Sequence, residues 1–260
     1  MKIVDSHCHA GMSWFEPIEM LVYQMDQNKV DHAVLIQHRG MYDSTYLLDC
    51  MRQYPGRFRV VAIVDSSRDD ALHNLELSAS QGIAGIRLNP TEKSKDHDPL
   101  SLWKRTESLG LVVSSLGTVE EFASKEFFRL VSLVPDLTIV VEHLAGVCVR
   151  DKDSLKVYRQ ALELAQYPNV KIKVGGLGEI CERPSRLLNQ FSMGDNSGVI
   201  EMALETFGIE RMMWGSDYPP VSSREGYGNA LDGIKTHQAF KTDEEREWIM
   251  GKTAIETFNF

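Results

Sequence analysis

The stretch that decides the fold is a short apolar strand, Lys2-Ile3-Val4-Asp5, which runs directly into Ser6-His7-Cys8-His9. Side chains alternate between the two faces of a β-strand, so His7 and His9 share one face and Cys8 takes the other. Two imidazoles at the end of an opening strand favour a functional site, because paired histidines serve as metal ligands or as acid and base groups. We interpret Cys8 as a packing residue.

The rest of the chain alternates short apolar strands with helical patterns. Eight strand–helix units are typical of a (β/α)8 barrel, and 260 residues suit one such barrel. No linker, repeat or low-complexity tract divides the chain. The sequence therefore predicts a single α/β domain over 1–260, a slightly distorted TIM-type barrel. The seven strand candidates after the first are 33–36, 60–64, 85–89, 111–113, 138–143, 170–174 and 211–217.

Local signals mark several helix ends and one long connection. Thr118 followed by Glu121 is a capping box and predicts one helix that continues through Val134. A second capping box begins at Thr242 and predicts a closing helix. The longest irregular segment, 175–198, follows the seventh strand, and a loop of this length in a compact domain is typically a lid or a substrate-binding loop.

Composition excludes several classes of protein. The net charge of -9 opposes a general nucleic-acid binder, which needs a basic face. No run of about 18 apolar residues indicates a membrane span, and the start of the chain lacks a leader pattern, which predicts a cytoplasmic protein. The cysteines form no C-x-x-C pair, so we expect reduced thiols. They are Cys8, Cys50, Cys148 and Cys181.

The carboxyl ends of the predicted strands carry many polar residues. Active sites of (β/α)8 barrels lie at these ends. Histidine, lysine, arginine and aspartate at so many independent strand ends indicate a built site. From strand one to strand eight they are His7 and His9, Gln37 and His38, Asp65, Arg87 and Asn89, Ser114 and Ser115, His143, Lys173, and Asp217.

Individual residue types at these ends suggest roles. Asp217 is the candidate general base, with a turn-capping role as the alternative. Arg87 is a candidate for binding a substrate carboxylate or hydroxyl, because a guanidinium can make two parallel bonds to a carboxylate. The alternative for Arg87 is an ion pair with a strand-end acid such as Asp65. Lys173 and His38 are further candidates for substrate binding, with structural roles left open for both.

Four motifs at the strand ends resemble the amidohydrolase superfamily. The similarity spans the whole chain and points to the amidohydrolase-2 branch, which contains 2-pyrone-4,6-dicarboxylate lactonase and sugar-lactone hydrolases. The resemblance implies a barrel enzyme. The motifs are Val-Asp-Ser-His-Cys-His at 4–9, Gly-Ile-Arg-Leu-Asn at 85–89, Val-Glu-His-Leu-Ala-Gly at 141–146 and Trp-Gly-Ser-Asp-Tyr-Pro at 214–219.

The resemblance also bears on a metal cofactor. Metal-binding members use the H-x-H pair, a histidine that ends strand five and the strand-eight aspartate, whereas strand five here ends in Ser114-Ser115-Leu116. Three protein ligands suffice for a catalytic zinc. The resemblance therefore implies that His7, His9 and Asp217 can hold a divalent ion, zinc or else manganese, with His143 completing or replacing a ligand. Some lactonase members work without metal, so metal-free catalysis stays open.

The predicted function is hydrolysis of a small cyclic ester, a lactone. Asp217 activates water, while His7, His9 and His143, or a bound metal, polarise the carbonyl. The alternative within the superfamily is a metal-dependent, non-oxidative decarboxylase of a small carboxylic acid. A barrel used only for binding or assembly is a third hypothesis, which the intact set of four residues opposes. We expect a small-molecule substrate. Whether that substrate is anionic and whether the protein is an oligomer are left open.

Overall fold

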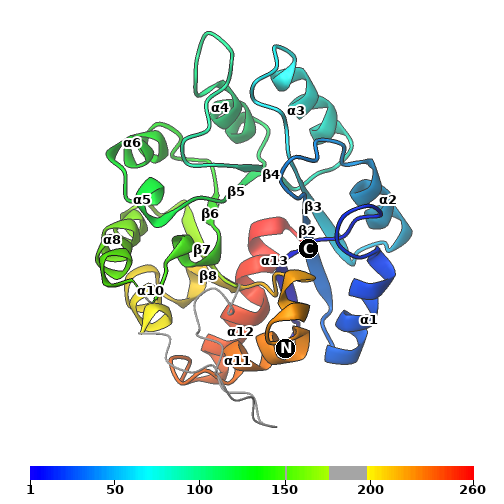
Figure 1. The fold of residues 1–260 in the computed structure, drawn as a ribbon, viewed down its shortest axis with the longest axis vertical. Coiled ribbons are helices and arrows are strands. Elements are labelled where there is room, and N and C mark those ends of the chain that lie inside the picture. The colour runs from blue at the N-terminus through cyan, green and yellow to red at the C-terminus, as the bar shows by residue number, and fades with distance from the viewer. Residues whose placement is uncertain (150, 176–197) are drawn as a thin grey trace.

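The computed structural model describes residues 1–149, 151–175 and 198–260. Within these ranges, eight parallel strands pair in sequence order and form a nearly closed barrel with helices around it (Figure 1). The predicted TIM-type (β/α)8 barrel is confirmed. The predicted lid, apart from its end residues, lies outside the described residues. The strands are β1 (Val4–Cys8), β2 (His32–Ile36), β3 (Phe58–Ala62), β4 (Gly85–Leu88), β5 (Val112–Ser115), β6 (Ile139–Val141), β7 (Val170–Val174) and β8 (Met212–Trp214).

Most predicted helices are present, but two short helices, His143–Gly146 and Tyr227–Lys235, were not predicted. The single helix expected from Thr118 to Val134 is wrong, because the chain forms two helices there. The Thr118 capping box starts the first, and Ser124 starts the second by accepting a hydrogen bond from the Phe127 backbone N–H (3.2 Å). The side chain of Ser124 thus competes with continuation of the first helix. The helices are α1 (Ile18–Asn28), α2 (Thr45–Gln53), α3 (Ala71–Ser80), α4 (Ser101–Ser108), α5 (Val119–Phe122), α6 (Lys125–Leu133), α7 (His143–Gly146), α8 (Lys152–Leu162), α10 (Val199–Phe207), α11 (Tyr227–Lys235), α12 (Asp243–Glu247) and α13 (Thr253–Phe258).

Two apolar layers hold the barrel together. The outer layer lies between the strands and the surrounding helices and includes Cys8, which is fully buried as predicted. The inner layer is smaller, and α13 packs against it through Phe258, which fills one end of the barrel. The other members of this inner layer are Val4, Val34, Ile36, Val61, Val112, Val140, Met213 and Ala254.

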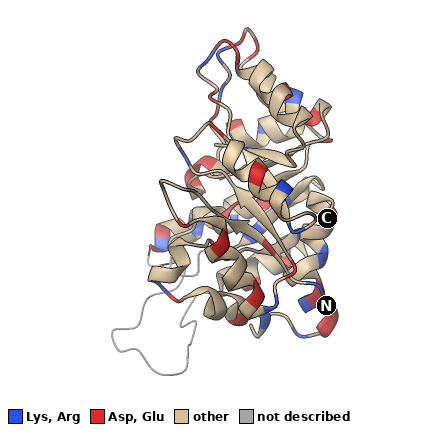
Figure 2. Cartoon of the chain, turned by 90° about the vertical axis from the view of Figure 1, so that its right-hand side faces the viewer, with Lys and Arg blue, Asp and Glu red and all other residues tan. Residues whose placement is uncertain are grey.

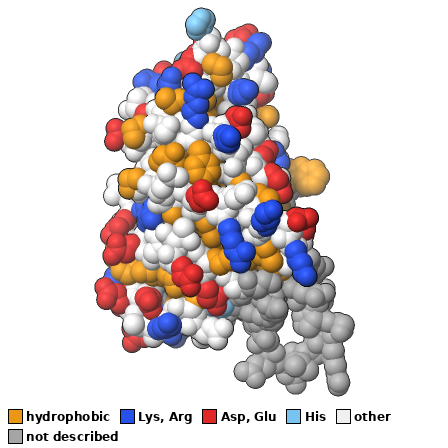
Figure 3. Space-filling view, turned by 90° about the vertical axis from the view of Figure 1, so that its left-hand side faces the viewer, with side chains coloured by type: hydrophobic (Ala, Val, Ile, Leu, Met, Phe, Trp, Pro, Cys, Tyr) orange, Lys and Arg blue, Asp and Glu red, His pale blue; other side chains and the backbone are white. Residues whose placement is uncertain are grey.

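Charged residues lie mainly on the helices and loops outside the sheet (Figure 2). On the face that Figure 3 shows, acidic and basic side chains are interspersed over the described residues, with no broad basic area. No helix in the described ranges combines the length and the apolar character needed to cross a bilayer.

The barrel closes between β1 and β8 through a buried carboxylate. The pairing of β1 with β2 shifts between Asp5 and Cys8, which places Val4 in the inner layer although Cys8, four residues later, lies in the outer layer. The Asp5 carboxylate lies at the end of β8. Asp5 Oδ1 accepts from the Ser216 backbone N–H (2.8 Å), and Oδ2 accepts from the hydroxyls of Ser216 (2.6 Å) and Tyr227 (2.9 Å). Burial raises the pKa of Asp5 to about 6, although these hydrogen bonds oppose the rise.

Candidate active site

The barrel mouth brings together four of the predicted residues. The rings of His7 and His9 lie 5.0 Å apart, and the rings of His7 and His143 lie 4.5 Å apart. Asp217 Oδ1 is 3.6 Å from His9 Nε2 and 3.9 Å from His7 Nε2. The shared face predicted for the two β1 histidines is therefore confirmed, and residues up to 210 positions apart in the sequence converge there.

Unusual backbone conformations aim two of these side chains. β6 ends at Val141 and β8 at Trp214, earlier than predicted, so the site residues of both lie in the following turns. His143 begins a left-handed turn with a φ of 49°, and Asp217 has a φ of 56°. Such conformations persist where surrounding contacts enforce them, which is typical of functional sites. Asp217 is tied by its backbone N–H, which donates to the His7 carbonyl (2.8 Å).

Gly215 allows the end of β8 to pass close to β1. A Cβ atom built on Gly215 would lie 2.6 Å from His7 Cβ and 2.9 Å from the His7 backbone nitrogen. No side chain fits in that space, so the glycine of the Trp-Gly-Ser-Asp motif is needed to seat Asp217 beside the histidines.

The histidine nitrogens differ in their partners. His9 Nδ1 donates to the Ile36 carbonyl (2.7 Å), which directs its Nε2 toward Asp217. His7 Nε2 and His143 Nδ1 are buried and have no hydrogen-bond partner among the described residues. A buried polar atom without a partner is costly unless a ligand satisfies it. The site is thus arranged to receive a metal ion, a water molecule or a substrate oxygen.

The donor set fits a divalent metal ion. One ligand atom each from His7, His9 and Asp217 lies within 4.8 Å of the others. Two imidazole nitrogens and a carboxylate oxygen, with an open position, are a ligand set of catalytic zinc. His143, predicted to complete or replace a ligand, belongs to a second group of this kind, which also contains His7 and Glu142.

Sequence reasoning missed Glu142, which lies at the centre of a buried network. Its Oε2 accepts from Arg87 Nη2 (2.7 Å), and its Oε1 accepts from Ser114 Oγ (2.6 Å), to which Lys173 Nζ donates (2.8 Å). Burial alone would raise the pKa of Glu142, but the cations of Arg87 and Lys173 outweigh it and lower that pKa to about 2. The ion pair weighed for Arg87 thus forms with Glu142, and not with Asp65. The sequence signal that could have identified Glu142 is its position directly before His143, the strand-six histidine.

Lys173 places a cation at the floor of the site. Its side chain is 1% exposed, and its Nζ lies 3.3 Å from His7 Nδ1. Burial lowers the pKa of Lys173 to about 8. Lys171, two residues earlier on β7, is only partly buried and donates to Thr257 Oγ1 (2.8 Å). The two lysines therefore have different environments. Their positions on the strand could not show by themselves which of the two is buried.

Two further residues border the site without having been predicted. Phe15 stacks on His9 with ring centroids 5.0 Å apart, and its edge faces His38 at 5.1 Å. Arg224 donates to Asp217 Oδ2 (3.0 Å). Burial would raise the pKa of Asp217, but the nearby His9, His143 and Arg224 side chains lower it overall. The carboxylate is therefore ionised at neutral pH and can accept a proton.

A model of the amidohydrolase family matches residues 5–260. The chain belongs to this family and is an enzyme of the amidohydrolase superfamily, which confirms the resemblance of its motifs. An uncharacterized protein, y4mH, of Sinorhizobium fredii is 31% identical over 116 residues, which are 42% of this chain and 36% of that protein. The chain thus matches about a third of the length of that relative.

Solved structures share the fold. An amidohydrolase of Burkholderia multivorans with bound zinc is 17% identical, with a TM-score of 0.82 and all of both chains covered. A putative 2-pyrone-4,6-dicarboxylic acid hydrolase of Pseudomonas putida is 22% identical, with a TM-score of 0.79 and 99% and 97% of the two chains covered. 5-Carboxyvanillate decarboxylase of Sphingomonas paucimobilis is 14% identical, with a TM-score of 0.65 and 100% and 99% covered. At these identities the likeness shows the fold alone.

Proposed function

We propose that this enzyme hydrolyses a small lactone and that Asp217 is its general base. The observation that carries the proposal is the placement of an ionised Asp217 carboxylate within 4 Å of two buried histidine nitrogens, one of which has no partner in the described chain. A base beside unsatisfied polar atoms is the arrangement that ester hydrolysis needs, because a water must lose a proton while the carbonyl oxygen gains negative charge.

In the mechanism that we propose, each group has one task. Asp217 accepts the proton of the attacking water, and Arg224 keeps that carboxylate oriented. His7, His9 and His143 face the carbonyl and stabilise the oxyanion as the tetrahedral intermediate forms. As the bond between the carbonyl carbon and the ring oxygen breaks, Asp217 gives this proton to the ring oxygen, which leaves as a hydroxyl group. The new carboxylic acid then ionises to a carboxylate. For substrate binding we propose Lys173, His38 and the edge of Arg87 that does not face Glu142.

We further propose that His7, His9 and Asp217 hold a divalent ion, zinc before manganese. When bound, such an ion lowers the pKa of a coordinated water and polarises a carbonyl. The unpartnered His7 Nε2 and the fixed orientation of His9 support this ligand set. Asp217 is the residue that both the metal-dependent and the metal-free reaction require.

The function is tested by a substrate panel. We expect purified protein to hydrolyse five- and six-membered lactones, followed as acid release with a pH indicator, and to leave aromatic and aliphatic carboxylic acids unchanged. Release of carbon dioxide from those acids, without lactone hydrolysis, would contradict the proposal and support the metal-dependent decarboxylase instead.

The metal site is tested by metal content. After dialysis against zinc, elemental analysis is expected to find about one zinc per chain, and His9→Ala is expected to reduce this to near zero because two ligands hold zinc weakly. His32→Ala is the matched control, since His32 bonds the Gly56 carbonyl away from the site. Equal zinc content in His9→Ala and the control would contradict the ligand set.

A further inference from the structure

The segment that carries Asp217 is fastened to β1 at several points. Three hydrogen bonds join the two segments directly: from Ser6 Oγ to the Trp214 carbonyl (2.6 Å), from the Asp217 N–H to the His7 carbonyl (2.8 Å), and from the His9 N–H to the Tyr218 carbonyl (2.7 Å). Ser216, directly before Asp217, is held in addition by a side chain, the carboxylate of Asp5. The proposed mechanism assigns no task to Asp5.

The Asp5 carboxylate is fully buried, and hydrogen-bond donors surround it. Its Oδ1 accepts from the backbone N–H groups of Ser216 (2.8 Å) and His7 (3.2 Å). Its Oδ2 accepts from the hydroxyls of Ser216 (2.6 Å) and Tyr227 (2.9 Å). Because each oxygen uses its two lone-pair sites, the carboxylate has one orientation, and it holds Ser216 by two bonds at once.

Asp217 requires such a restraint because its backbone is left-handed, with a φ of 56°. Residues other than glycine keep such a conformation only where their surroundings enforce it. The bond from the Asp217 N–H to the His7 carbonyl is a single attachment, about which the turn could pivot. The attachment of Ser216 to Asp5, one residue earlier, removes that freedom.

Tyr227 connects Asp5 to the chain on the other side of Asp217. Tyr227 begins α11, and Arg224, three residues earlier, donates to Asp217 Oδ2 (3.0 Å). The Tyr227 hydroxyl fixes the start of α11 to Asp5. Asp5 therefore restrains both the backbone before Asp217 and the segment that brings a guanidinium to its carboxylate.

We propose that Asp5 is a positioning residue, which holds Asp217 in the geometry that a general base needs. The proposal rests on the proposed lactone hydrolysis and adds to it a residue that acts without touching the substrate. Asp5 acts through Ser216 and Tyr227.

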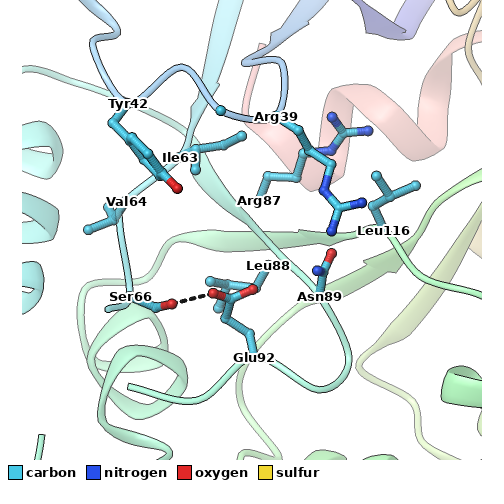
Figure 4. A pocket seen from close by; sticks show the side chains of 11 residues that line it. Arg39, Tyr42, Ile63, Val64, Ser66, Arg87, Leu88, Asn89, Glu92 and Leu116 are labelled. Carbon is cyan, nitrogen blue, oxygen red and sulfur yellow. Dashed lines mark hydrogen bonds between the residues drawn. The ribbon is translucent and has the colours of Figure 1, made fainter. Parts of the chain in front are cut away.

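Asp5 lies outside the cavity that borders the site. This polar cavity of about 270 Å³ opens beside Arg87, and Figure 4 shows Glu92 across it from Arg39 and Arg87. Arg87 joins the cavity to the site, because it donates to Glu142. Asp5 is not among the lining residues. We therefore expect a change at Asp5 to displace the base and to leave substrate binding in this cavity nearly unchanged.

The first test compares Asp5→Ala with Asp31→Ala. Asp31 is the matched control, because it is exposed and accepts from the Ile3 N–H (2.8 Å) at the opposite end of β1. In Asp5→Ala we expect kcat to fall about 10- to 100-fold and KM to change less than about threefold, as when a reacting group is misplaced by about 1 Å. Asp31→Ala should keep the wild-type kcat. Equal kcat in the two folded variants would overturn the proposal.

The conservative variant Asp5→Asn tests whether hydrogen bonding explains the effect. Its amide oxygen can accept from both backbone N–H groups, and its amide nitrogen can donate to the hydroxyls of Ser216 and Tyr227 after these rotate. We therefore expect kcat within about fivefold of the wild-type value. A kcat as low as that of Asp5→Ala would overturn a role in positioning through these hydrogen bonds.

A double-mutant cycle tests whether Asp5 acts through Asp217. In the Asp217→Asn background the base is absent, so we expect Asp5→Ala to lower kcat by less than about threefold further. A purely structural contribution of Asp5 would lower kcat equally in both backgrounds. That result would overturn the proposal.

Amide hydrogen exchange tests the link without a substrate and thus separates this inference from the proposed function. If no lactone is hydrolysed, the proposed function fails, but exchange at the N–H groups of Ser216 and Asp217 still reports on the turn. We expect this exchange to be at least about tenfold faster in Asp5→Ala than in Asp31→Ala, because local opening becomes easier. Equal exchange in the two variants would overturn the positioning role.

Tyr227→Phe provides the same comparison if Asp5→Ala does not fold. It removes the hydroxyl that donates to Asp5 Oδ2 and keeps the ring, whose edge contacts Trp214 and Tyr218. We expect faster exchange at the Asp217 N–H than in Asp31→Ala. Exchange equal to that of the control would overturn the proposal.

Discussion

Replacing Asp217 by asparagine is expected to lower kcat about 10²- to 10⁴-fold, the range over which general bases contribute. Asparagine has nearly the same shape as aspartate but does not accept a proton at neutral pH. It also keeps an oxygen that can accept the hydrogen bond now given by Arg224. Initial rates with the best lactone of the panel would measure the loss, and circular dichroism would verify that the barrel remains folded.

The matched control for this variant is Asp49→Asn on the exposed side of α2, where Asp49 pairs with Arg52 on the surface. We expect wild-type kcat in Asp49→Asn. A folded Asp217→Asn protein with the same kcat as the control would rule out Asp217 as the base.

Replacing Glu142 by glutamine is expected to lower the free energy of unfolding by about 3 to 5 kcal/mol, as when one partner of a buried ion pair is removed. Arg87 and Lys173 would then be buried without their counter-charge. The folded-state pKa of Glu142 is about 2 and its ordinary value is 4.5. The carboxylate therefore stabilises the fold above pH 4.5, and this contribution disappears as the pH falls through 2.

Urea denaturation at neutral pH measures this effect, and Glu76→Gln is the matched control. Glu76 pairs with Arg105 between side chains that are 46% and 41% exposed. An exposed pair of this kind contributes less than about 1 kcal/mol. Equal unfolding midpoints for Glu142→Gln and Glu76→Gln would show that the buried network does not stabilise the barrel.

Much of the fold was predictable because its signals are local. Apolar runs separated by helical spacing predicted the eight strands, and alternation along the first strand predicted which face carries His7 and His9. Capping boxes predicted two helix starts correctly. The end of the helix after Thr118 was not predictable. Ser124 starts the second helix by capping it, and that helix is stable because its apolar face packs against the core, which no local pattern shows.

The candidate site was predictable in its members but not in its pairings. Strand ends in a parallel barrel converge, so His7, His143 and Asp217 could be expected to lie together. The partner of Arg87 could not, since Glu142 lies 55 positions away and several acidic residues compete for the same guanidinium. Burial decides which acid pairs with Arg87. The barrel interior excludes the water that would weaken the ion pair.

The sequence by itself therefore determined the barrel and the convergence of its polar strand ends, which follow from residue spacing along the chain. It also determined the resemblance to amidohydrolases, which the four strand-end motifs carry. Only the tertiary structure decided the shift in the pairing of β1, the hydrogen bond between Ser216 and Asp5, the contact of Phe15 with His9, and the cavity at Glu92. These features depend on which loops meet when the barrel closes. Side-chain packing and desolvation over long sequence separations fix them, and no local pattern records such contacts.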